Sequence, residues 1–308
     1  QIFNVDQSFD QTIFQGASCA FGVFDGVHKG HQFLIECAKQ SAQASGGKSL
    51  VLTFDVDPDE VFRPDQLKKL MTNEDRIATL AQSGVDGVVV LPFTREFAAS
   101  SPEEFLYKTF GDMTPAFLHI GFDFKFGARA KGTVEDLRQW GEAHQVTIDA
   151  HGLKAEDGAP ISATRIRALL SEGDIAEANR LLGHPYYVAG TVEPGRGEGA
   201  DMGFRTANLE IATAFRALSD GVYAAWADVD GTRYKAAVNV GVPATFADRS
   251  HATCEVHLLD FDEDLYGRSV RVEFLHWLRP MKKFDDINEL IATVQGNIAW
   301  VRENLSVS

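Results

Sequence analysis

The sequence contains few cysteines and no long apolar run. Its three cysteines, Cys19, Cys37 and Cys254, form no CxxC pair, and no cluster of histidine and cysteine has the spacing of a zinc site. This pattern favours a reducing, cytoplasmic compartment. No stretch of about 18 apolar residues occurs, and residues 1–4 lack the basic stretch of a signal peptide. We therefore expect a protein that neither spans a membrane nor is exported.

Positive charge is also scarce. The 308 residues include 29 Lys and Arg against 44 Asp and Glu, which gives a net charge of −15. A nucleic-acid partner needs a basic surface, so the composition argues against DNA or RNA binding and leaves local sites for small anions. Hydrophobic residues make up 44% of the chain, which predicts folding throughout. At about 100 to 200 residues per domain, the length predicts two domains.

The first half alternates strand patterns with helix patterns. Its apolar runs are of the kind that a parallel sheet buries on both faces, and helix signals separate them. This alternation predicts a doubly wound parallel α/β sheet. The predicted strands are 18–24, 49–54, 87–91, 116–121 and 146–148, and the predicted helices begin near 31, 73, 101, 133, 162 and 175.

After residue 182 the pattern changes, and residues 183–185 are typical of a turn. Short alternating runs separated by glycine follow, which predicts a small antiparallel β-barrel. Asp230-Gly231 is a strong hairpin signal between two of these runs. We therefore expect an α/β domain over 1–185 and a β domain over 186–308 with an amphipathic terminal helix. The predicted strands are 222–229, 234–240, 255–259 and 270–274, and the helix is 284–305.

The most informative stretch is residues 22–31, GVFDGVHKGH. It places His28 and His31 where a strand is followed by a helix, on a turn rich in glycine. At the carboxyl end of a parallel strand, such a turn brings backbone N–H groups and a helix N-terminus against an anion, and imidazoles can donate to it. The stretch therefore predicts a cradle for nucleotide phosphates. The alternative is an ordinary turn whose histidines only cap the helix.

Residues 22–31 resemble the HxGH nucleotidyltransferases, and among them the flavin-adenylylating members. Residues 161–167 (ISATRIR) resemble the helix start that meets the ATP phosphates in that family, although alone they would be an ordinary cap. Residues 121–127 (GFDFKFG) resemble the family's GxDFxFG marker. The resemblance implies transfer of AMP from ATP to FMN with Mg²⁺, in which His28 and His31 stabilise charge on the phosphates. It implies nucleotide contacts from Gly22, Phe24, Asp25, Gly30, Asp123, Ser162, Thr164, Arg165 and Arg167.

The first half departs from this family at three places. Val56-Asp57-Pro58 stands where the family often has PHP, Ala163 replaces a common second serine, and some members have a basic residue near Pro160. Asp57 matters most, because a carboxylate near a flavin phosphate would repel it. By the same resemblance four phenylalanines are candidates to stack on a flavin, and we expect at least two of them to be core residues. They are Phe54, Phe62, Phe124 and Phe126.

In the second half, residues 195–209 join a glycine-rich loop to Thr206 and Asn208. Glycines such as Gly195 and Gly203 let backbone amides approach phosphates closely. The neutral oxygens of Thr206 and Asn208 suit a Mg²⁺ ion that keeps waters and shares the ATP phosphates. The alternative interpretation is a flexible surface turn that leads into a strand.

Residues 203–208 (GFRTAN) resemble the GFPTAN motif of the riboflavin kinase module, and the likeness extends over most of 187–300. Among its landmarks are 239–241 (NVG), Thr245-Phe246 and 255–267, which contains EVHLLDF and DLYG. The resemblance implies that Glu255 is the general base that takes the proton from the ribityl 5′-hydroxyl as it attacks the γ-phosphorus of ATP. The alternative is a solvent-facing glutamate on a strand. The departures are Arg205 for the usual proline, and Glu198, Ala200 and Met281.

The two resemblances together predict a bifunctional enzyme. The second half would convert riboflavin to FMN and the first half FMN to FAD, with ATP as co-substrate, Mg²⁺ in both sites and only small molecules as partners. One alternative keeps the adenylyltransferase but makes the second half an impaired, flavin-binding module. Another is a flavin-nucleotide sensor without turnover, suggested by Asp57 and Ala163. The sequence predicts no oligomeric state.

Overall fold

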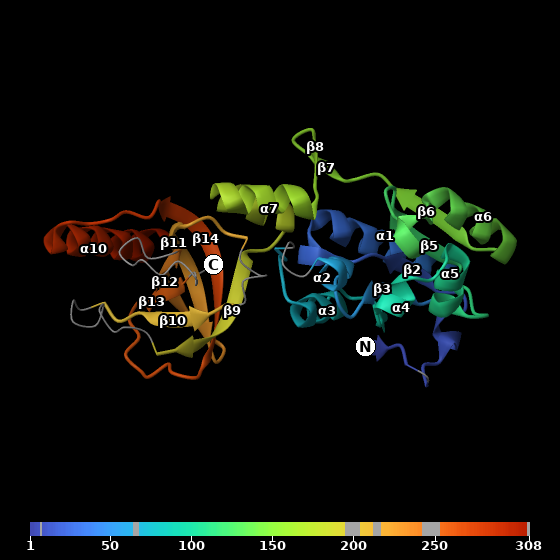
Figure 1. The fold of residues 1–308 in the computed structure, drawn as a ribbon, viewed down its shortest axis with the longest axis horizontal. Helices are drawn as coiled ribbons and strands as arrows, with labels where there is room; N and C mark the ends of the chain where they lie inside the picture. The colour runs from blue at the N-terminus through green and yellow to red at the C-terminus, as the bar shows by residue number, and fades with distance from the viewer. Residues whose placement is uncertain (7, 64–67, 195–203, 212–216, 242–252, 307–308) are drawn as a thin grey trace. The chain divides into compact units, whose positions relative to one another are not determined.

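The computed structural model describes residues 1–6, 8–63, 68–194, 204–211, 217–241 and 253–306 (Figure 1). The chain divides into two compact units. The first unit ends at Ala163, so contacts divide the chain earlier than residue 185; where one function gives way to the other stays a prediction. Unit 1 comprises Gln1–Leu67 and Met71–Ala163, and unit 2 comprises Lys68–Leu70 and Thr164–Ser308.

Unit 1 is built on a six-stranded sheet with the order β1-β4-β3-β2-β5-β6, in which each pairing is parallel. From β2 the chain moves outward through β3 and β4, and then returns to β5 on the other side of β2. The topological switch point therefore lies between β2 and β5, where doubly wound sheets bind ligands at the carboxyl ends of their strands. The strands are β1 (Ile2–Asn4), β2 (Ser18–Phe21), β3 (Ser49–Phe54), β4 (Gly87–Leu91), β5 (Phe117–Gly121) and β6 (Thr147–His151).

The helices of unit 1 begin and end at local sequence signals. Thr133 and Asp136 form a capping box at the start of α6, and Ser101 with Glu104 does the same for α5. Gly46, with φ of 72°, ends α1 in the left-handed region. The elements are η1 (Gln11–Phe14), η2 (Asp25–Val27), α1 (Lys29–Ser45), α2 (Pro58–Phe62), α3 (Asn73–Ala81), α4 (Arg95–Ala98), α5 (Pro102–Phe110), η3 (Ala128–Ala130) and α6 (Val134–His144), with the small hairpin β7 (Ala155–Glu156) and β8 (Ala159–Pro160).

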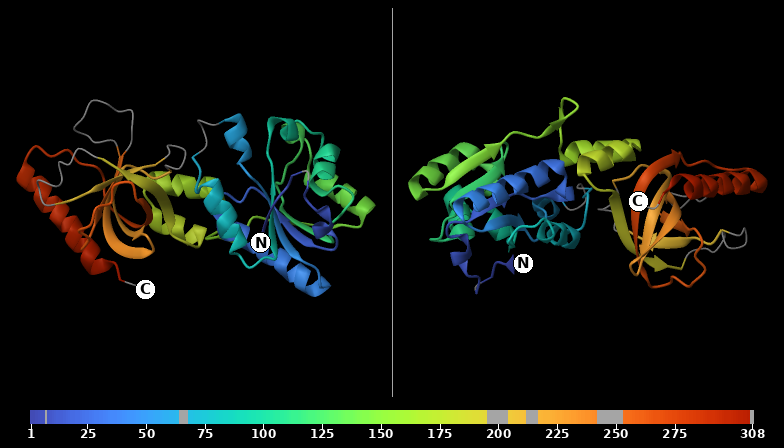
Figure 2. Two further views of the ribbon diagram at one scale, coloured as in Figure 1. Left: turned by 90° about the horizontal axis from the view of Figure 1, so that it is seen from below. Right: turned by 180° about the vertical axis from the view of Figure 1, so that it is seen from behind.

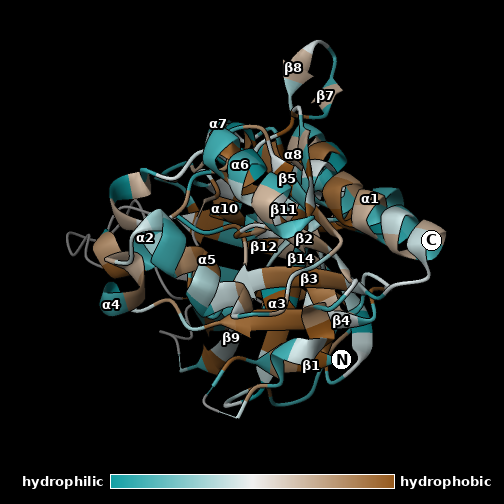
Figure 3. Cartoon of the chain, turned by 90° about the vertical axis from the view of Figure 1, so that its right-hand side faces the viewer, coloured by the Kyte–Doolittle hydropathy of each residue, from teal (hydrophilic) through white to brown (hydrophobic). Residues whose placement is uncertain are grey.

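The sheet is covered on both faces. Alternate residues, such as Leu52 of β3 and Leu118 of β5, form a hydrophobic cluster with Phe105 of α5 and Leu137 of α6. Helix α1 packs on β2, β3 and β5, and its buried Ile35 lies outside that cluster. Because neighbouring residues of a strand point to opposite faces, α1 covers the second face. Figure 2 shows helices on both sides of the sheet, and Figure 3 shows the hydrophobic character of β3 and β4.

Unit 2 contains a closed antiparallel barrel with the strand order β10-β13-β12-β11-β14-β9. Asp230 and Gly231 have φ of 51° and 84°, as a two-residue hairpin turn of the primed type requires. The predicted hairpin between β11 and β12 is therefore confirmed. The strands are β9 (Tyr186–Glu193), β10 (Ala207–Glu210), β11 (Gly221–Val229), β12 (Thr232–Gly241), β13 (Thr253–Leu258) and β14 (Ser269–Arg279).

The described part of this unit also contains helices, which are α7 (Ala163–Glu172, within unit 2 from Thr164), α8 (Ile175–Leu182) and α10 (Ile287–Asn304). Asn179 ties α8 to the barrel, since its side-chain amide donates to the Phe274 carbonyl at 2.8 Å and its oxygen accepts from Tyr186 N–H at 2.7 Å. Val301 of α10 packs against Trp226 of β11. The architecture confirms the α/β and β-barrel prediction. Within the described ranges, no helix has both the length and the apolar character that crossing a membrane requires.

Candidate functional site

The turn that follows β2 has an unusual backbone. Phe24, Gly26 and Val27 all have positive φ, at 62°, 75° and 39°. A β-branched residue such as Val27 avoids this region, so surrounding contacts must hold the turn in place. Val27 is only 3% exposed and its N–H donates to the Phe24 carbonyl at 3.0 Å. The turn therefore directs residues 28–31 to the carboxyl end of the sheet in one fixed conformation.

His28 and His31 form a stacked pair at the start of α1. Their ring centroids are 3.6 Å apart with an interplanar angle of 17°. His28 is the N-cap of α1, and its Nδ1 accepts the backbone N–H of His31 at 3.3 Å. Because Nδ1 is an acceptor, a neutral His28 carries its hydrogen on Nε2. A Cβ on Gly30 would lie 3.1 Å from the His28 ring, so glycine at this position lets the ring approach the helix.

The electrostatics of the pair favour an uncharged His31. Burial lowers the pKa of His31 well below its usual value, and the neighbouring His28 and Arg76 charges lower it further. Its Nδ1 is buried and has no hydrogen-bond partner in the described residues. An unsatisfied buried ring nitrogen costs free energy, so this nitrogen has capacity for a bound group.

Arg76 of α3 is a fully buried cation beside this turn. Its guanidinium donates to the Val23 carbonyl at 2.9 Å, to Thr53 Oγ1 at 2.5 Å and to the Phe54 carbonyl at 2.7 Å. These acceptors follow β2 or end β3, so one side chain joins the carboxyl ends of two neighbouring strands. Burial lowers the pKa of Arg76, and the carboxylates of Asp57 and its neighbours oppose that shift.

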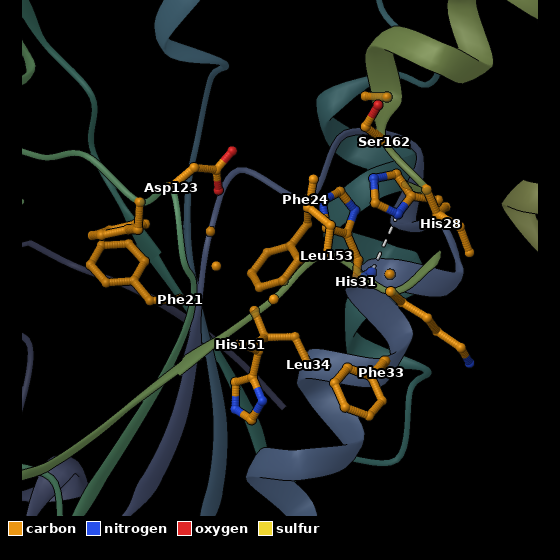
Figure 4. Close-up of a pocket in the computed structure, with 18 residues that line it drawn as sticks. Phe21, Phe24, His28, His31, Phe33, Leu34, Asp123, His151, Leu153 and Ser162 are labelled. Atoms are coloured by element: carbon orange, nitrogen blue, oxygen red, sulfur yellow. Dashed lines mark hydrogen bonds between the residues drawn. The ribbon is translucent and has the colours of Figure 1, made fainter. Parts of the chain in front are cut away.

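The histidine pair opens into a pocket of about 250 Å³ within unit 1 (Figure 4). Asp123 and Phe124 reach it from the loop after β5, and Ser162 from the segment before α7. Ends of β2 and β5 thus meet here, at the switch point of the sheet. Seven of the predicted site residues line this pocket. They are the catalytic candidates His28 and His31 and the nucleotide-binding candidates Gly22, Phe24, Gly30, Asp123 and Ser162.

The remaining predicted residues of the first half lie elsewhere. Asp25 is buried in η2, at 5% exposure. Thr164, Arg165 and Arg167 are on the part of α7 that belongs to unit 2. There Arg165 pairs with Glu177 at 3.2 Å, and Arg167 Nε donates to a backbone carbonyl of unit 2 at 2.6 Å.

Asp57 has a clear local role. Its carboxylate caps α2 by accepting the Asp59 N–H at 2.9 Å, and Glu60 completes the capping box by accepting the Asp57 N–H at 3.0 Å. The nearby Arg76 charge offsets its negative charge. Asp57 stands where the family usually has another residue, and its carboxylate serves as the N-cap of α2.

The four phenylalanines that are candidates to stack on a flavin differ in how far they are buried. Phe54 and Phe126 are core residues, as expected for at least two of them. Phe124 is partly buried and lines the pocket. Phe62 is 53% exposed and packs edge-on against Phe93. Phe124 and Phe62 remain the candidates for contact with a flavin.

In unit 2 a polar row crosses three adjacent barrel strands. Asn208 of β10 lies opposite Glu255 of β13, which lies opposite Asn239 of β12. Their neighbours Ala207, Val256 and Val238 are buried, so the row lies on the other face. Cross-strand neighbours have Cβ atoms about 5 Å apart, which brings the three side chains together.

The donor set of this row suits a magnesium ion. Asn208 and the exposed Thr206 offer neutral oxygens, and Glu255 offers a carboxylate. The side-chain oxygen of Asn239 is buried without a hydrogen-bond partner in the part of the chain that the structure describes. Gly195, Gly203, Glu198, Ala200 and Thr245-Phe246 lie outside the described residues.

Both halves match families of known activity. A FAD synthetase family matches residues 10–165, and a riboflavin kinase family matches residues 182–305. Curated proteins named bifunctional riboflavin kinase/FMN adenylyltransferase match most of the chain. The Listeria monocytogenes protein is 36% identical over 279 residues, covering 90% of this chain and 88% of its own. The Escherichia coli K12 protein is 32% identical over 294 residues, covering 94% and 93%. The chain belongs to the bifunctional riboflavin kinase/FMN adenylyltransferase family.

A solved structure is similar along the whole length. It is described as a macrolide-efflux protein from Streptococcus pneumoniae, and it shares 30% identity, a TM-score of 0.85 and 99% coverage of both chains. Macrolide efflux is the description of the Streptococcus protein and is not carried over to this chain. The match shows that each unit of this chain has the fold of the corresponding part of that structure. The FAD synthetase match covers the histidine pocket, and the riboflavin kinase match covers the polar row.

The histidine pocket lies within the FAD synthetase match, and for that reason we name it the FAD synthetase pocket. Several of its residues were not predicted from the sequence. Phe33, His151, Leu153 and Lys154 all line it. For His151 a signal existed, because it ends β6 and carboxyl ends of parallel strands converge. The predicted strand stopped at residue 148 and so missed it. Arg76 gave no local signal, since a lysine or arginine on a helix is normally exposed.

Proposed function

We propose that the chain converts riboflavin to FMN in its riboflavin kinase half and FMN to FAD in its FAD synthetase half, each time with ATP. The observation that carries the FAD synthetase assignment is the His31 Nδ1, buried and without a partner among the described residues, in a pocket that also gathers His28, Ser162 and Asp123. The polar row of Asn208, Glu255 and Asn239 supports the kinase assignment.

In the FAD synthetase half, a phosphate oxygen of FMN attacks the α-phosphorus of ATP and the bond to pyrophosphate breaks. The Nε2–H of His28 and the His31 ring donate to phosphate oxygens as negative charge builds on them. The N-terminus of α1 adds backbone N–H groups and the positive end of the helix dipole. Positioning and charge stabilisation thus replace covalent catalysis.

In the riboflavin kinase half, Glu255 accepts the proton of the ribityl 5′-hydroxyl as that oxygen attacks the γ-phosphorus of ATP and ADP leaves. Thr206 and Asn208 would hold Mg²⁺, which neutralises phosphate charge when bound. The observed register keeps Glu255 directly beside Asn208, so the base and the phosphate-binding oxygens are neighbours on one sheet face.

We also propose that the protein works in a reducing compartment, the cytoplasm. The described structure contains no disulfide, and Cys19 and Cys254 are buried. Burial raises the pKa of the Cys19 thiol, which keeps it protonated and unreactive.

Product analysis tests the proposed function. The full chain is incubated with excess ATP and Mg²⁺ and either riboflavin or FMN, and flavins and pyrophosphate are quantified. We expect FMN and FAD from riboflavin, and FAD with equimolar pyrophosphate from FMN. If FAD is formed from FMN but no FMN is formed from riboflavin, the kinase half is impaired. Arg205, which stands where the family usually has proline, favours this outcome because its guanidinium pairs with the Asp262 carboxylate at 2.7 Å. Binding of FMN and ATP without any product would identify a sensor.

A further inference from the structure

A second histidine pair borders the FAD synthetase pocket. His119 lies on β5, and Asp149 and His151 lie on the adjacent β6, where His119 pairs in register with Asp149. All three side chains therefore point to the sheet face that α1 covers. His119 Nδ1 lies 2.9 Å from His151 Nε2 and 3.7 Å from Asp149 Oδ2. The family motifs described above include none of these residues.

The surroundings of His119 determine which nitrogen carries its hydrogen. Burial lowers the pKa of His119 to about 4, so the ring is neutral near pH 7. One hydrogen therefore lies between the two rings, either on His119 Nδ1 or on His151 Nε2. A hydrogen on His119 Nδ1 faces the Asp149 carboxylate favourably, whereas a lone pair there would face it unfavourably.

The Nε2 atom of His119 also indicates that the hydrogen lies on His119 Nδ1. Its Nε2 is buried without a partner in the described structure. If His151 were the donor, His119 would have to carry its hydrogen on this Nε2, and a buried N–H without an acceptor is rarely found. His119 therefore donates from Nδ1, His151 accepts at Nε2, and a neutral His151 carries its hydrogen on Nδ1.

The Nδ1 edge of His151 is the edge away from the buried His119. His151 lines the pocket together with Phe33 and Leu153 (Figure 4). The rings of His151 and Phe33 pack edge-on, with their centroids 5.7 Å apart. Phe33 and Leu153 are each 40% exposed, so this end of the pocket combines apolar surface with the imidazole of His151. Such a wall suits a flat heteroaromatic ring with an acceptor on its edge.

We propose that His151 is a specificity-determining residue of the FAD synthetase pocket, where its Nδ1–H donates to an acceptor atom on the heteroaromatic ring of a substrate. His119, oriented by Asp149, is the positioning residue that sets this tautomer. The inference rests on the proposed function for the identity of the ring, which is either the adenine of ATP or the isoalloxazine of FMN. Both carry ring-edge nitrogen acceptors, and the kinetic arms below separate them.

The kinetic test compares two variants of the full chain. His151→Leu removes the donor, whereas His151→Asn keeps an N–H donor near the Nδ1 position. For His151→Leu we expect KM to rise about tenfold for one substrate, with kcat within about twofold, as loss of one hydrogen bond to an uncharged acceptor predicts. A higher KM for ATP identifies adenine as the ring that His151 contacts, and a higher KM for FMN identifies the isoalloxazine. We expect His151→Asn to stay within about threefold of the wild type.

Unchanged KM values for both substrates in His151→Leu would overturn the proposal, and so would an equal loss in His151→Asn. Binding isotherms for FMN and for ATP on the same variants give the same comparison without turnover. An inactive wild type would therefore count against the proposed function alone, while the isotherms would still decide the role of His151.

The tautomer is tested directly by ¹⁵N NMR of the imidazole nitrogens. In the wild type we expect His119 and His151 each to carry the hydrogen on Nδ1. In His119→Leu we expect His151 to become a mixture of tautomers. The KM for the substrate that His151 recognises should then rise. A wild-type His151 with its hydrogen on Nε2 and a bare Nδ1 would refute the inference, whether or not His119→Leu folds.

Discussion

The candidate site of unit 1 is built from nitrogen donors, whereas that of unit 2 is built from oxygens. In unit 1 stacked imidazoles and a helix N-terminus lie at the carboxyl ends of parallel strands. In unit 2 two amides and a carboxylate lie across three antiparallel strands. Both sites are proposed to bind ATP, but the surrounding fold supplies different groups.

This difference follows from backbone geometry. A parallel sheet ends its strands at one edge, where helix N-termini provide N–H groups that bind phosphate directly. A barrel has no such edge, and its strands instead place side chains in rows. A row of oxygens binds phosphate through a metal. We therefore expect the second site to combine Mg²⁺ with a general base, and the first site to combine Mg²⁺ with fixed nitrogen donors.

The largest effect is expected from Glu255→Gln, which removes the proposed base without changing its size. FMN formation from riboflavin should fall about 10³-fold, within the range for general bases, while FAD formation from FMN stays at the wild-type rate. Steady-state flavin analysis measures both rates. Glu210→Gln, on the exposed end of β10, is the matched control. Equal losses in both reactions would mean that the two sites are not separate.

The next effect is expected from His31→Ala. Loss of a preorganised donor should reduce FAD formation from FMN by about 10²-fold or more, with FMN formation unchanged. Pyrophosphate release gives the rate. His144→Ala, on the exposed face of α6, controls for removal of a histidine from unit 1. Near-normal FAD production by His31→Ala would show that the pair only caps α1.

The imidazole site should also make stability depend on pH. The pKa of His119 is lowered to about 4 and that of His31 well below its usual value, so the unfolded chain takes up protons first as the pH falls below about 6.5. The free energy of unfolding should therefore fall on acidification from pH 6.5 towards 4, by up to about 1.4 kcal/mol per pH unit and histidine. Urea unfolding at several pH values measures the slope. His119→Leu should have a shallower slope, and an identical slope would contradict this account.

The smallest effect is expected at Asp57. Asp57→Ala should lower the free energy of unfolding by about 1 kcal/mol through loss of the α2 cap, whereas Asp57→Asn keeps a capping side chain. Because the structure assigns the carboxylate to the cap, KM for FMN should stay within about twofold in both variants. Chemical denaturation and FMN saturation curves measure the two quantities. A lower KM in both would instead support repulsion of the flavin phosphate by Asp57.

Much of the fold was predictable, because its strands follow local rules. The predicted strands 49–54 and 87–91 match β3 and β4 residue for residue, since continuous apolar runs of this length are typical of parallel strands. Strand β9, by contrast, was not predicted. Its burial alternates only in its second part, after Tyr186, Tyr187 and Val188 are all buried, so its periodicity is weak.

The sequence by itself determined the two motifs, the order of the two folds and the residues that carry the proposed chemistry, because caps, turns and runs act over a few neighbouring residues. Only the tertiary structure brought Arg76 to the ends of β2 and β3, and His119 to His151, at separations of 53 and 32 residues. Such contacts depend on strand order and on which face each side chain occupies. A change of one residue in register would place His119 on the opposite face of the sheet, so the tautomer of His151 is a property of the folded sheet.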